Sequence, residues 1–335
     1  MQTVRLGKTE LVVSKNGFGA LPIQRISQAD AVYLLQKAFD SGINYYDTAR
    51  WYTDSEEKMG IALAHVRDKI IISTKTGATE ATQFWSDLET SLTNLKTDYI
   101  DIYQFHNPAF CPKPGEADGL YEAMLKAKEQ GKIRHIGITN HRLAVAKEAV
   151  DSGLYATLQF PFSYLASASE VDLVEACKKA DIGFIAMKAL SGGLITDSGA
   201  AYAYLAQFEN VAPIWGVQRE SELDEFISYQ DNPPVLTPER LSKIESDKKT
   251  LSGEFCRGCG YCMPCPAGIE INNCARMSLL LRRAPKETYL TDEWKEKMQK
   301  IENCIHCNQC MSKCPYGLNT PELLAKNYED FKTFI

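Results

Sequence analysis

The chain has 335 residues, 44% of them hydrophobic, and its 37 basic and 43 acidic residues leave a formal net charge of -6. This length allows one large core and a smaller second domain, while an acidic balance without a basic run disfavours a nucleic-acid partner. No apolar stretch approaches the roughly 18 residues needed to cross a bilayer, and the N-terminus lacks the apolar core of a signal peptide. We therefore expect a cytoplasmic protein without a membrane partner.

The first 235 residues alternate short apolar runs with amphipathic segments, after an expected hairpin over 4–6 and 11–14. The predicted strands are 17–20, 44–47, 70–75, 99–106, 135–140, 158–160, 184–187 and 213–217. Helices are predicted between them at 28–40, 56–64, 85–95, 119–129, 143–151 and 170–179. Eight such units predict an α/β protein with a (β/α)8 TIM barrel. No G-x-G-x-x-G follows the first strand, which argues against a doubly wound nucleotide-binding sheet.

The alternation ends at the sequence Asp-Asn-Pro-Pro-Val, which begins at residue 231. Thr237, Pro238 and Glu239 then offer an N-cap, a first-turn proline and an acidic first turn for a helix to about residue 249. The expected domains are a barrel at 1–235, a connecting helix and linker at 236–252, and a small, mainly α-helical, cysteine-rich domain at 253–335. Helices are expected there at 271–282, 292–301 and 322–331.

Four polar residues occur at or just beyond the ends of predicted strands, which is where TIM barrels carry their chemistry. They are Asp47, Tyr52, Lys75 and His106. If these strand ends converge, a buried Lys75 favours the tyrosinate form of Tyr52, and Asp47 keeps the lysine charged and oriented. Tyr52 then becomes a usable general acid. A substrate carbonyl bonded to Tyr52 and His106 would be stabilised as negative charge develops on its oxygen.

The motifs around these residues resemble those of the aldo-keto reductase family over roughly residues 3 to 230. They are Asp47-Thr-Ala followed by Tyr52 and Ser55-Glu56, then Ser73-Thr-Lys75 and Ile102-Tyr-Gln-Phe-His106. The resemblance implies an NADP- or NAD-dependent enzyme of the EC 1.1.1.- type with the catalytic tetrad Asp47, Tyr52, Lys75 and His106. It also implies cofactor contacts at Gly19, Thr139, Asn140, Gln159, Met187, Ser191, Gly193, Gly216, Gln218, Arg219 and Glu222.

Two departures from the family pattern bear on the cofactor and the substrate. Met187 stands where many members have an aromatic residue that stacks on the nicotinamide, and Arg219 is the one basic residue placed to meet a 2'-phosphate. We expect NADP to be preferred over NAD on family habit alone. The family's C-terminal substrate loop is replaced by the Cys-rich domain, which leaves Trp51 and the loop at 107–118 as the expected pocket walls.

Nine of the eleven cysteines occur after residue 250, and eight of these form two runs, which favours metal ligation in a reducing compartment. The second run matches the ferredoxin pattern C-x2-C-x2-C-x3-C-P, and the first is one residue shorter before its last cysteine. By the crossed pattern of such runs, one [4Fe-4S] cluster is held by Cys256, Cys259, Cys262 and Cys314, and the other by Cys304, Cys307, Cys310 and Cys265. The alternative is a pair of zinc sites, which seldom show an unbroken triplet followed by Cys-Pro.

The spacing of the two runs resembles the α-helical ferredoxin module, which implies two clusters close enough to exchange electrons. Together, the tetrad motifs and the two cysteine runs lead to one main hypothesis. The protein is an NAD(P)H-dependent enzyme acting on a small carbonyl or alcohol, and its clusters serve a redox partner protein or shape the substrate mouth. The alternatives are an electron carrier whose barrel only binds nucleotide and docks a partner, or a regulatory subunit. Because exposed low-potential clusters are damaged by oxygen, an anaerobic or microaerobic host is expected.

Overall fold

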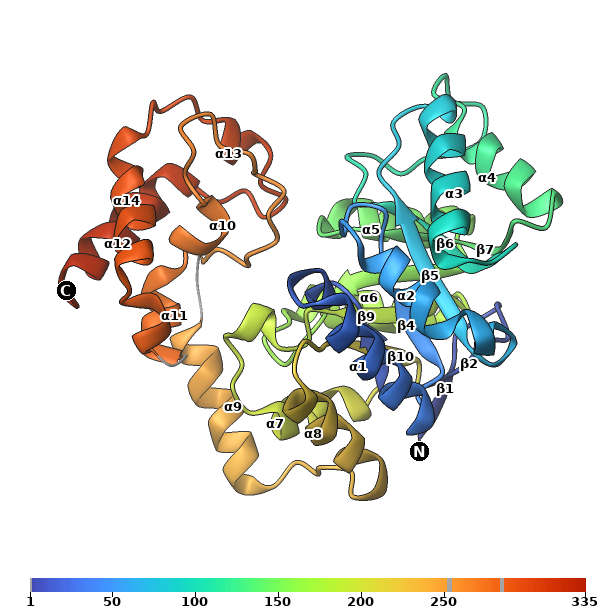
Figure 1. The fold of residues 1–335 in the computed structure, drawn as a ribbon, viewed down its shortest axis with the longest axis horizontal. Helices are drawn as coiled ribbons and strands as arrows, with labels where there is room; N and C mark the ends of the chain where they lie inside the picture. Colours follow the sequence, from blue (N-terminus) through green and yellow to red (C-terminus); the bar gives the residue numbers. More distant parts are fainter. Residues whose placement is uncertain (1, 252–254, 284–285) are drawn as a thin grey trace. The chain divides into compact units, whose positions relative to one another are not determined.

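The computed structural model describes residues 2–251, 255–283 and 286–335, and Figure 1 shows its ribbon. The chain forms two compact units. The first comprises Met1–Ala189 and Tyr202–Val235, and the second comprises Leu190–Ala201 and Leu236–Ile335. The second unit thus includes a segment of twelve residues that was predicted within the barrel domain. The expected boundary between residues 252 and 253 lies outside the described residues.

The first unit is a closed parallel barrel, as the alternating pattern predicted. Its strands follow one another around the barrel in chain order, with β10 paired to β3. They are β3 (Gly17–Gly19), β4 (Tyr45–Asp47), β5 (Ile71–Thr76), β6 (Ile100–His106), β7 (Ile133–Thr139), β8 (Thr157–Pro161), β9 (Gly183–Met187) and β10 (Val211–Gly216). Because helices cover such strands from outside while side chains fill the interior, the strands are buried on both faces.

The N-terminal hairpin of β1 (Thr3–Arg5) and β2 (Val12–Ser14) closes one end of this barrel. Val4, Leu6 and Val13 pack in one cluster with Tyr45, Ile102 and Ile185 from the barrel strands. Gly7 also bridges Ile182, the residue before β9 begins. The hairpin therefore covers the end of the barrel at which the strands begin. The candidate active site lies at the opposite end, where the strands finish.

The helices around the barrel include all six that were predicted and two that were not. They are α1 (Gln28–Asp40), α2 (Ser55–Leu63), α3 (Ala81–Leu95), α4 (Leu120–Glu129), α5 (Leu143–Ser152), α6 (Ala168–Lys179), α7 (Ser198–Ala206) and α8 (Glu220–Asp231). The sequence of α7, SGAAYAYLA, is apolar on all sides, so it carries no amphipathic signal. In α1, Ser27 accepts a hydrogen bond from the Asp30 backbone, which supplies the capping that the amphipathic run required.

The second unit is mainly helical. Its helices are α9 (Pro238–Thr250), α10 (Ile271–Cys274), α11 (Met277–Arg283), α12 (Asp292–Gln299), α13 (Gln309–Ser312) and α14 (Thr320–Lys332). The helix predicted over 271–282 is interrupted between α10 and α11. Asn327 of α14 explains the break, because it donates to the Ala275 carbonyl at 3.1 Å and accepts from the Ser278 N–H at 2.8 Å. Among the described helices, none combines the length and the apolar character that crossing a membrane would require.

Candidate active site and iron-sulfur sites

Three of the four predicted tetrad residues lie at the strand ends of neighbouring barrel strands. Asp47 ends β4, Lys75 is the penultimate residue of β5, and His106 ends β6. Their exposed fractions are 2%, 1% and 7%. Parallel strands place their C-terminal ends on one rim of the barrel, so these side chains are brought to the same place by the pairing of β4, β5 and β6.

Asp47 and Lys75 form a buried ion pair. The Lys75 Nζ lies 2.6 Å from Asp47 Oδ1 and donates a second hydrogen bond to the Thr48 carbonyl at 2.5 Å. Burial lowers the pKa of Lys75, and the charge of Asp47 opposes that change. The carboxylate is in turn bonded by Ser73 Oγ at 2.6 Å and Gln159 Nε2 at 3.2 Å. The pair is therefore fixed in position by protein groups alone.

Tyr52 lies beside this pair, in the loop after β4. The Lys75 Nζ is 5.3 Å from the centroid of the Tyr52 ring, and the ring meets that of His106 edge-on at 5.8 Å. Burial, with the positive charge of Lys75, holds the pKa of His106 well below its usual range. His106 is therefore a neutral imidazole at physiological pH, able to donate one hydrogen bond without adding a second cation to the site.

Trp51, a predicted pocket wall, is held against the same rim. Its ring lies 4.8 Å from that of His106 at an interplanar angle of 32°. A Cβ on Gly77 would lie 1.8 Å from Trp51 Cζ2, so the indole rests directly on the backbone there. The residue is nevertheless 52% exposed. An indole that is fixed by the protein and half open to solvent offers apolar surface beside His106.

A buried carboxylate that the sequence did not mark as functional secures the loop carrying Trp51 and Tyr52. Glu56, on α2, is fully buried and accepts hydrogen bonds from Thr74 and Ser91, each at 2.7 Å. It also forms an ion pair with Arg50 at 2.6 Å. Arg50 donates its backbone N–H to the Lys75 carbonyl at 3.0 Å. This network ties the loop to the strand that carries Lys75.

Ser73 and Gln104 also belong to the site; both stand within the motifs quoted from the sequence, but neither was predicted as a site residue. Side chains two apart on a strand share a face, so Ser73 lies on the same side of β5 as Lys75. That spacing was the available signal. Gln104, on β6, approaches Asp47 Oδ2 at 3.5 Å and donates to Gln159 Oε1 at 2.9 Å, a contact that depends on three strands closing together.

The residues expected to meet the cofactor are distributed over both units. Thr139, Asn140 and Gln159 are buried at the ends of β7 and along β8, and Asn140 Nδ2 donates to the Pro108 carbonyl at 2.8 Å. Met187 ends β9. Ser191 and Gly193 belong to the second unit, in the segment Leu190–Ala201.

Gly19 and Gly216 lie at the rim, where two neighbouring strands are closely packed. They face each other in the register of β3 and β10 at the rim. A Cβ on Gly216 would lie 3.0 Å from Pro22, and one on Gly19 would lie 3.1 Å from the Trp215 carbonyl. Side chains at either position would crowd these neighbours, so packing within the protein accounts for both glycines. The buried amides of Asn140 and Gln159 are polar groups of the kind that a dinucleotide would meet.

Arg219 and Glu222 lie where α8 begins, after β10. Glu222 accepts from the backbone N–H groups of Gln218 and Arg219 at 3.0 and 3.1 Å and pairs with the Arg219 guanidinium at 2.6 Å. The Arg219 side chain is 71% exposed. The one predicted basic contact is thus at the surface and engaged with a carboxylate.

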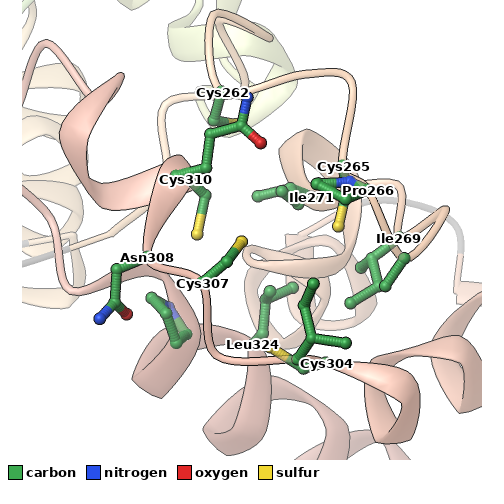
Figure 2. A pocket seen from close by; sticks show the side chains of 14 residues that line it. Cys262, Cys265, Pro266, Ile269, Ile271, Cys304, Cys307, Asn308, Cys310 and Leu324 are labelled. Carbon is green, nitrogen blue, oxygen red and sulfur yellow. The ribbon is translucent and has the colours of Figure 1, made fainter.

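In the second unit, five cysteines line one cavity together with apolar residues such as Ile269, Ile271 and Leu324. They are Cys262, Cys265, Cys304, Cys307 and Cys310. Figure 2 shows the sulfur atoms of Cys265, Cys307 and Cys310 facing the same space. Cys262 and Cys265, both from the first run, thus line one cavity with three cysteines of the second run. The crossed pattern assigns Cys265 to this group and Cys262 to the other cluster, and that pairing stays a prediction. An apolar cavity with thiols around it fits a cluster whose irons each take one cysteine.

The three other cysteines of the two runs, Cys256, Cys259 and Cys314, lie close together, and Cys262 is a neighbour of this group as well. Burial raises the pKa of Cys256, and the nearby Cys259 and Cys314 raise it further. Burial raises the pKa of Cys262 to about 12, with contributions from Cys256 and Cys259. These four are the set expected to hold the first cluster. Cys274 is buried elsewhere, with its Sγ 3.8 Å from the Lys297 carbonyl, and it does not line the cavity.

Two models of known protein families match this chain. The model of the aldo/keto reductase family matches residues 15–200, and that of a 4Fe-4S dicluster domain matches residues 255–319. L-galactose dehydrogenase of Arabidopsis thaliana is 32% identical over 213 residues, covering 58% of this chain and 67% of its own length. The oxidoreductase YqkF of Bacillus subtilis is 30% identical over 211 residues, covering 59% and 67%.

Among solved structures, the fold is similar to that of an aldo-keto reductase of Bacillus halodurans in its holo form. The TM-score is 0.66 at 24% identity, and the match covers 76% of this chain and 98% of the other. The two family matches and the oxidoreductases among the relatives together indicate an oxidoreductase with iron-sulfur sites. The chain belongs to the aldo/keto reductase family and carries a 4Fe-4S dicluster domain at its C-terminus.

Proposed function

We propose that the protein reduces a carbonyl, or oxidises the corresponding alcohol, with NAD(P)H or NAD(P) as the hydride donor or acceptor and Tyr52 as general acid and base. The observation that carries this proposal is the buried Lys75 ammonium, bonded to Asp47 at 2.6 Å and placed 5.3 Å from the centre of the Tyr52 ring. A module that only bound nucleotide would have no need of a buried ion pair beside a rim tyrosine, because burying two charges is costly.

When bound, a reduced nicotinamide would supply a hydride for the carbonyl carbon. Tyr52 donates its phenolic proton to the carbonyl oxygen as negative charge develops there. Lys75 stabilises the resulting tyrosinate by its charge, while Asp47 holds the ammonium in place. Neutral His106 donates a hydrogen bond to the same oxygen, which orients the carbonyl without offering a competing acid. For alcohol oxidation, the proton moves from the hydroxyl to the tyrosinate.

NADP is the proposed preference, with NAD as the alternative. Arg219 would meet the 2'-phosphate after leaving Glu222. Exposed ion pairs contribute only about 0–1 kcal/mol, so moving the Arg219 side chain from Glu222 to the phosphate would cost little free energy. If Arg219 stays on Glu222, the Glu222 carboxylate would repel a phosphate and NAD would be used equally well.

The proposed substrate has a ring or other flat apolar surface close to its carbonyl group. Trp51 supports this, because its indole rests on Gly77 beside His106 and remains 52% exposed. An aromatic pair adds about 0.5–1.5 kcal/mol beyond the burial of area. A small aliphatic carbonyl would forgo this contact.

The experiment is an anaerobic screen of aromatic aldehydes, sugars and short aliphatic aldehydes with NADPH and with NADH. We expect turnover of ring-bearing carbonyls, and Trp51→Ala should raise KM for them while leaving KM for aliphatic aldehydes unchanged. A protein with full cluster content that turns over none of these carbonyls, and oxidises none of the alcohols, would contradict the proposal.

A second function, electron transfer to a partner protein, is favoured by the surface around the second run. Cys307 is exposed, and the neighbouring Ile305 is 65% exposed, which would bring a cluster close to a docked protein. Hydride transfer moves two electrons and each cluster accepts one, so exchange between them needs a radical or a flavin. Fast bleaching of the clusters by NAD(P)H without a carbonyl substrate would favour the carrier function, and unchanged clusters would favour the reductase.

A further inference from the structure

Arg276 connects two segments of the second unit that are distant in sequence. It lies between α10 and α11, and its Nη1 donates to the Gly192 carbonyl at 3.0 Å. Seven residues on, Arg283 Nε donates to the Leu194 carbonyl at 2.6 Å and its Nη2 pairs with Asp247 at 2.5 Å. Two arginines thus hold carbonyls of the segment that contains Ser191 and Gly193.

The other side of the Arg276 guanidinium lies against the first Cys run. A Cβ on Gly258 would lie 2.7 Å from Arg276 Cζ, and a Cβ on Gly192 would lie 2.7 Å from its Nη1. Both glycines have positive φ, 63° and 67°, where other residues would be strained. The guanidinium is therefore in close contact with the backbone of Gly258, between Cys256 and Cys259, and with that of Gly192.

This position brings a positive charge close to cluster ligands. The guanidinium lies against Gly258, two residues after Cys256, and the Gly258 N–H donates to Cys256 Sγ at 3.4 Å. Reduction of a [4Fe-4S] cluster adds one negative charge, and nearby charge and hydrogen bonds set the potential at which this happens. A fixed guanidinium here would stabilise the reduced form and raise the potential.

We propose that Arg276 is a positioning residue that links the first cluster, held by the Cys256 set, to the loop Ser191–Gly193. One side chain tunes the potential of the cluster and holds the loop in the conformation that receives the dinucleotide. The second half rests on the proposed function, in which Ser191 and Gly193 meet the pyrophosphate. Cluster reduction and dinucleotide affinity are then coupled through this residue, and the coupling is reciprocal.

Two variants of the holoprotein separate charge from hydrogen bonding. Arg276→Gln keeps an N–H donor without the charge, and Arg276→Lys keeps the charge without the planar fork. Arg282→Ala is the matched control, because it also removes one positive charge, at a residue of the adjacent helix α11 whose partner is Asp330. The readouts are the midpoint potentials of both clusters by anaerobic EPR titration and the Kd for NADPH by fluorescence.

We expect Arg276→Gln to make one of the two potentials more negative and to leave the other unchanged, with Arg276→Lys close to the native values. Kd should rise in both variants by about two-fold to ten-fold, the equivalent of one hydrogen bond, with kcat at saturation unchanged. Equal potentials in Arg276→Gln and Arg282→Ala would overturn the cluster half, and native Kd values in both Arg276 variants would overturn the loop half. If the native protein bound no dinucleotide, the proposed function would be wrong. The midpoint potentials would still test whether Arg276 tunes the cluster.

Discussion

The barrel site and the cysteine sites are organised in opposite ways. In the barrel, Asp47 and Lys75 are buried and each is bonded by protein groups, so the geometry is complete before any ligand arrives. The cysteines lie on two runs about forty residues apart, Cys307 is exposed, and the sulfurs surround a cavity. The first kind of site is built by the fold, whereas in the second the bound cluster joins the runs and contributes to folding.

The largest effect is expected from breaking the crossed pairing of the cysteines. Cys265 shares a cavity with Cys304, Cys307 and Cys310, so Cys265→Ala should abolish the cluster of the second run and reduce iron from about eight to about four per chain. Anaerobic EPR and iron analysis measure this, and Cys304→Ala should lose the same EPR signal. Cys274→Ala is the control that keeps both clusters. Loss of one and the same signal in Cys265→Ala and Cys256→Ala would show that each run holds its own cluster.

Removing a buried charge from the barrel should cost stability and leave the clusters intact. Glu56→Gln removes the carboxylate that Arg50, Thr74 and Ser91 share, and we expect the free energy of unfolding to fall by about 2–4 kcal/mol. Urea unfolding followed by tryptophan fluorescence measures it. Glu57→Gln, an exposed neighbour on the same helix, should change stability by less than about 0.5 kcal/mol. Equal effects of the two changes would mean that the network contributes little.

The pH dependence of barrel stability should reflect His106. Its pKa is depressed in the folded state, so between that value and about 6.5 the unfolded chain binds a proton that the folded chain does not. Stability should therefore fall as the pH drops below about 6.5. His106→Gln should reduce this slope, and His306→Gln, at an exposed position, should leave it unchanged. An unaltered slope in His106→Gln would mean that the folded imidazole titrates normally.

The smallest effect is expected at Arg219, where the surface pair with Glu222 is exposed. Arg219→Ala should raise KM for NADPH by about two-fold to five-fold through loss of one exposed charge contact, and leave KM for NADH unchanged. Steady-state kinetics with both dinucleotides measure this. A parallel rise for both would show that Arg219 contacts a part that the two share, and no change for either would remove it from the site.

The sequence predicted the parts of the molecule that periodicity and spacing encode. The eight strands of the barrel follow from alternating apolar runs, and the proximity of the two cysteine runs was expected from the ferredoxin spacing. The crossed pairing itself stays a prediction. Contacts that require closure of the fold were missed. Gln104 reaches Asp47 across the barrel, and the break between α10 and α11 depends on Asn327 of a helix fifty residues away. The sequence also did not predict that Leu190–Ala201 packs in the second unit, because no local pattern in this segment indicates its packing partner.

The central claim is that a buried ammonium makes Tyr52 an acid, and Tyr52→Phe tests it most directly. The substitution keeps the ring that packs near Lys75 and His106 and removes only the hydroxyl. Under anaerobic conditions with saturating NADPH, we expect kcat for carbonyl reduction to fall by about 10²- to 10⁴-fold, with native iron content and native dinucleotide Kd. Turnover at the native rate in this variant would contradict the account.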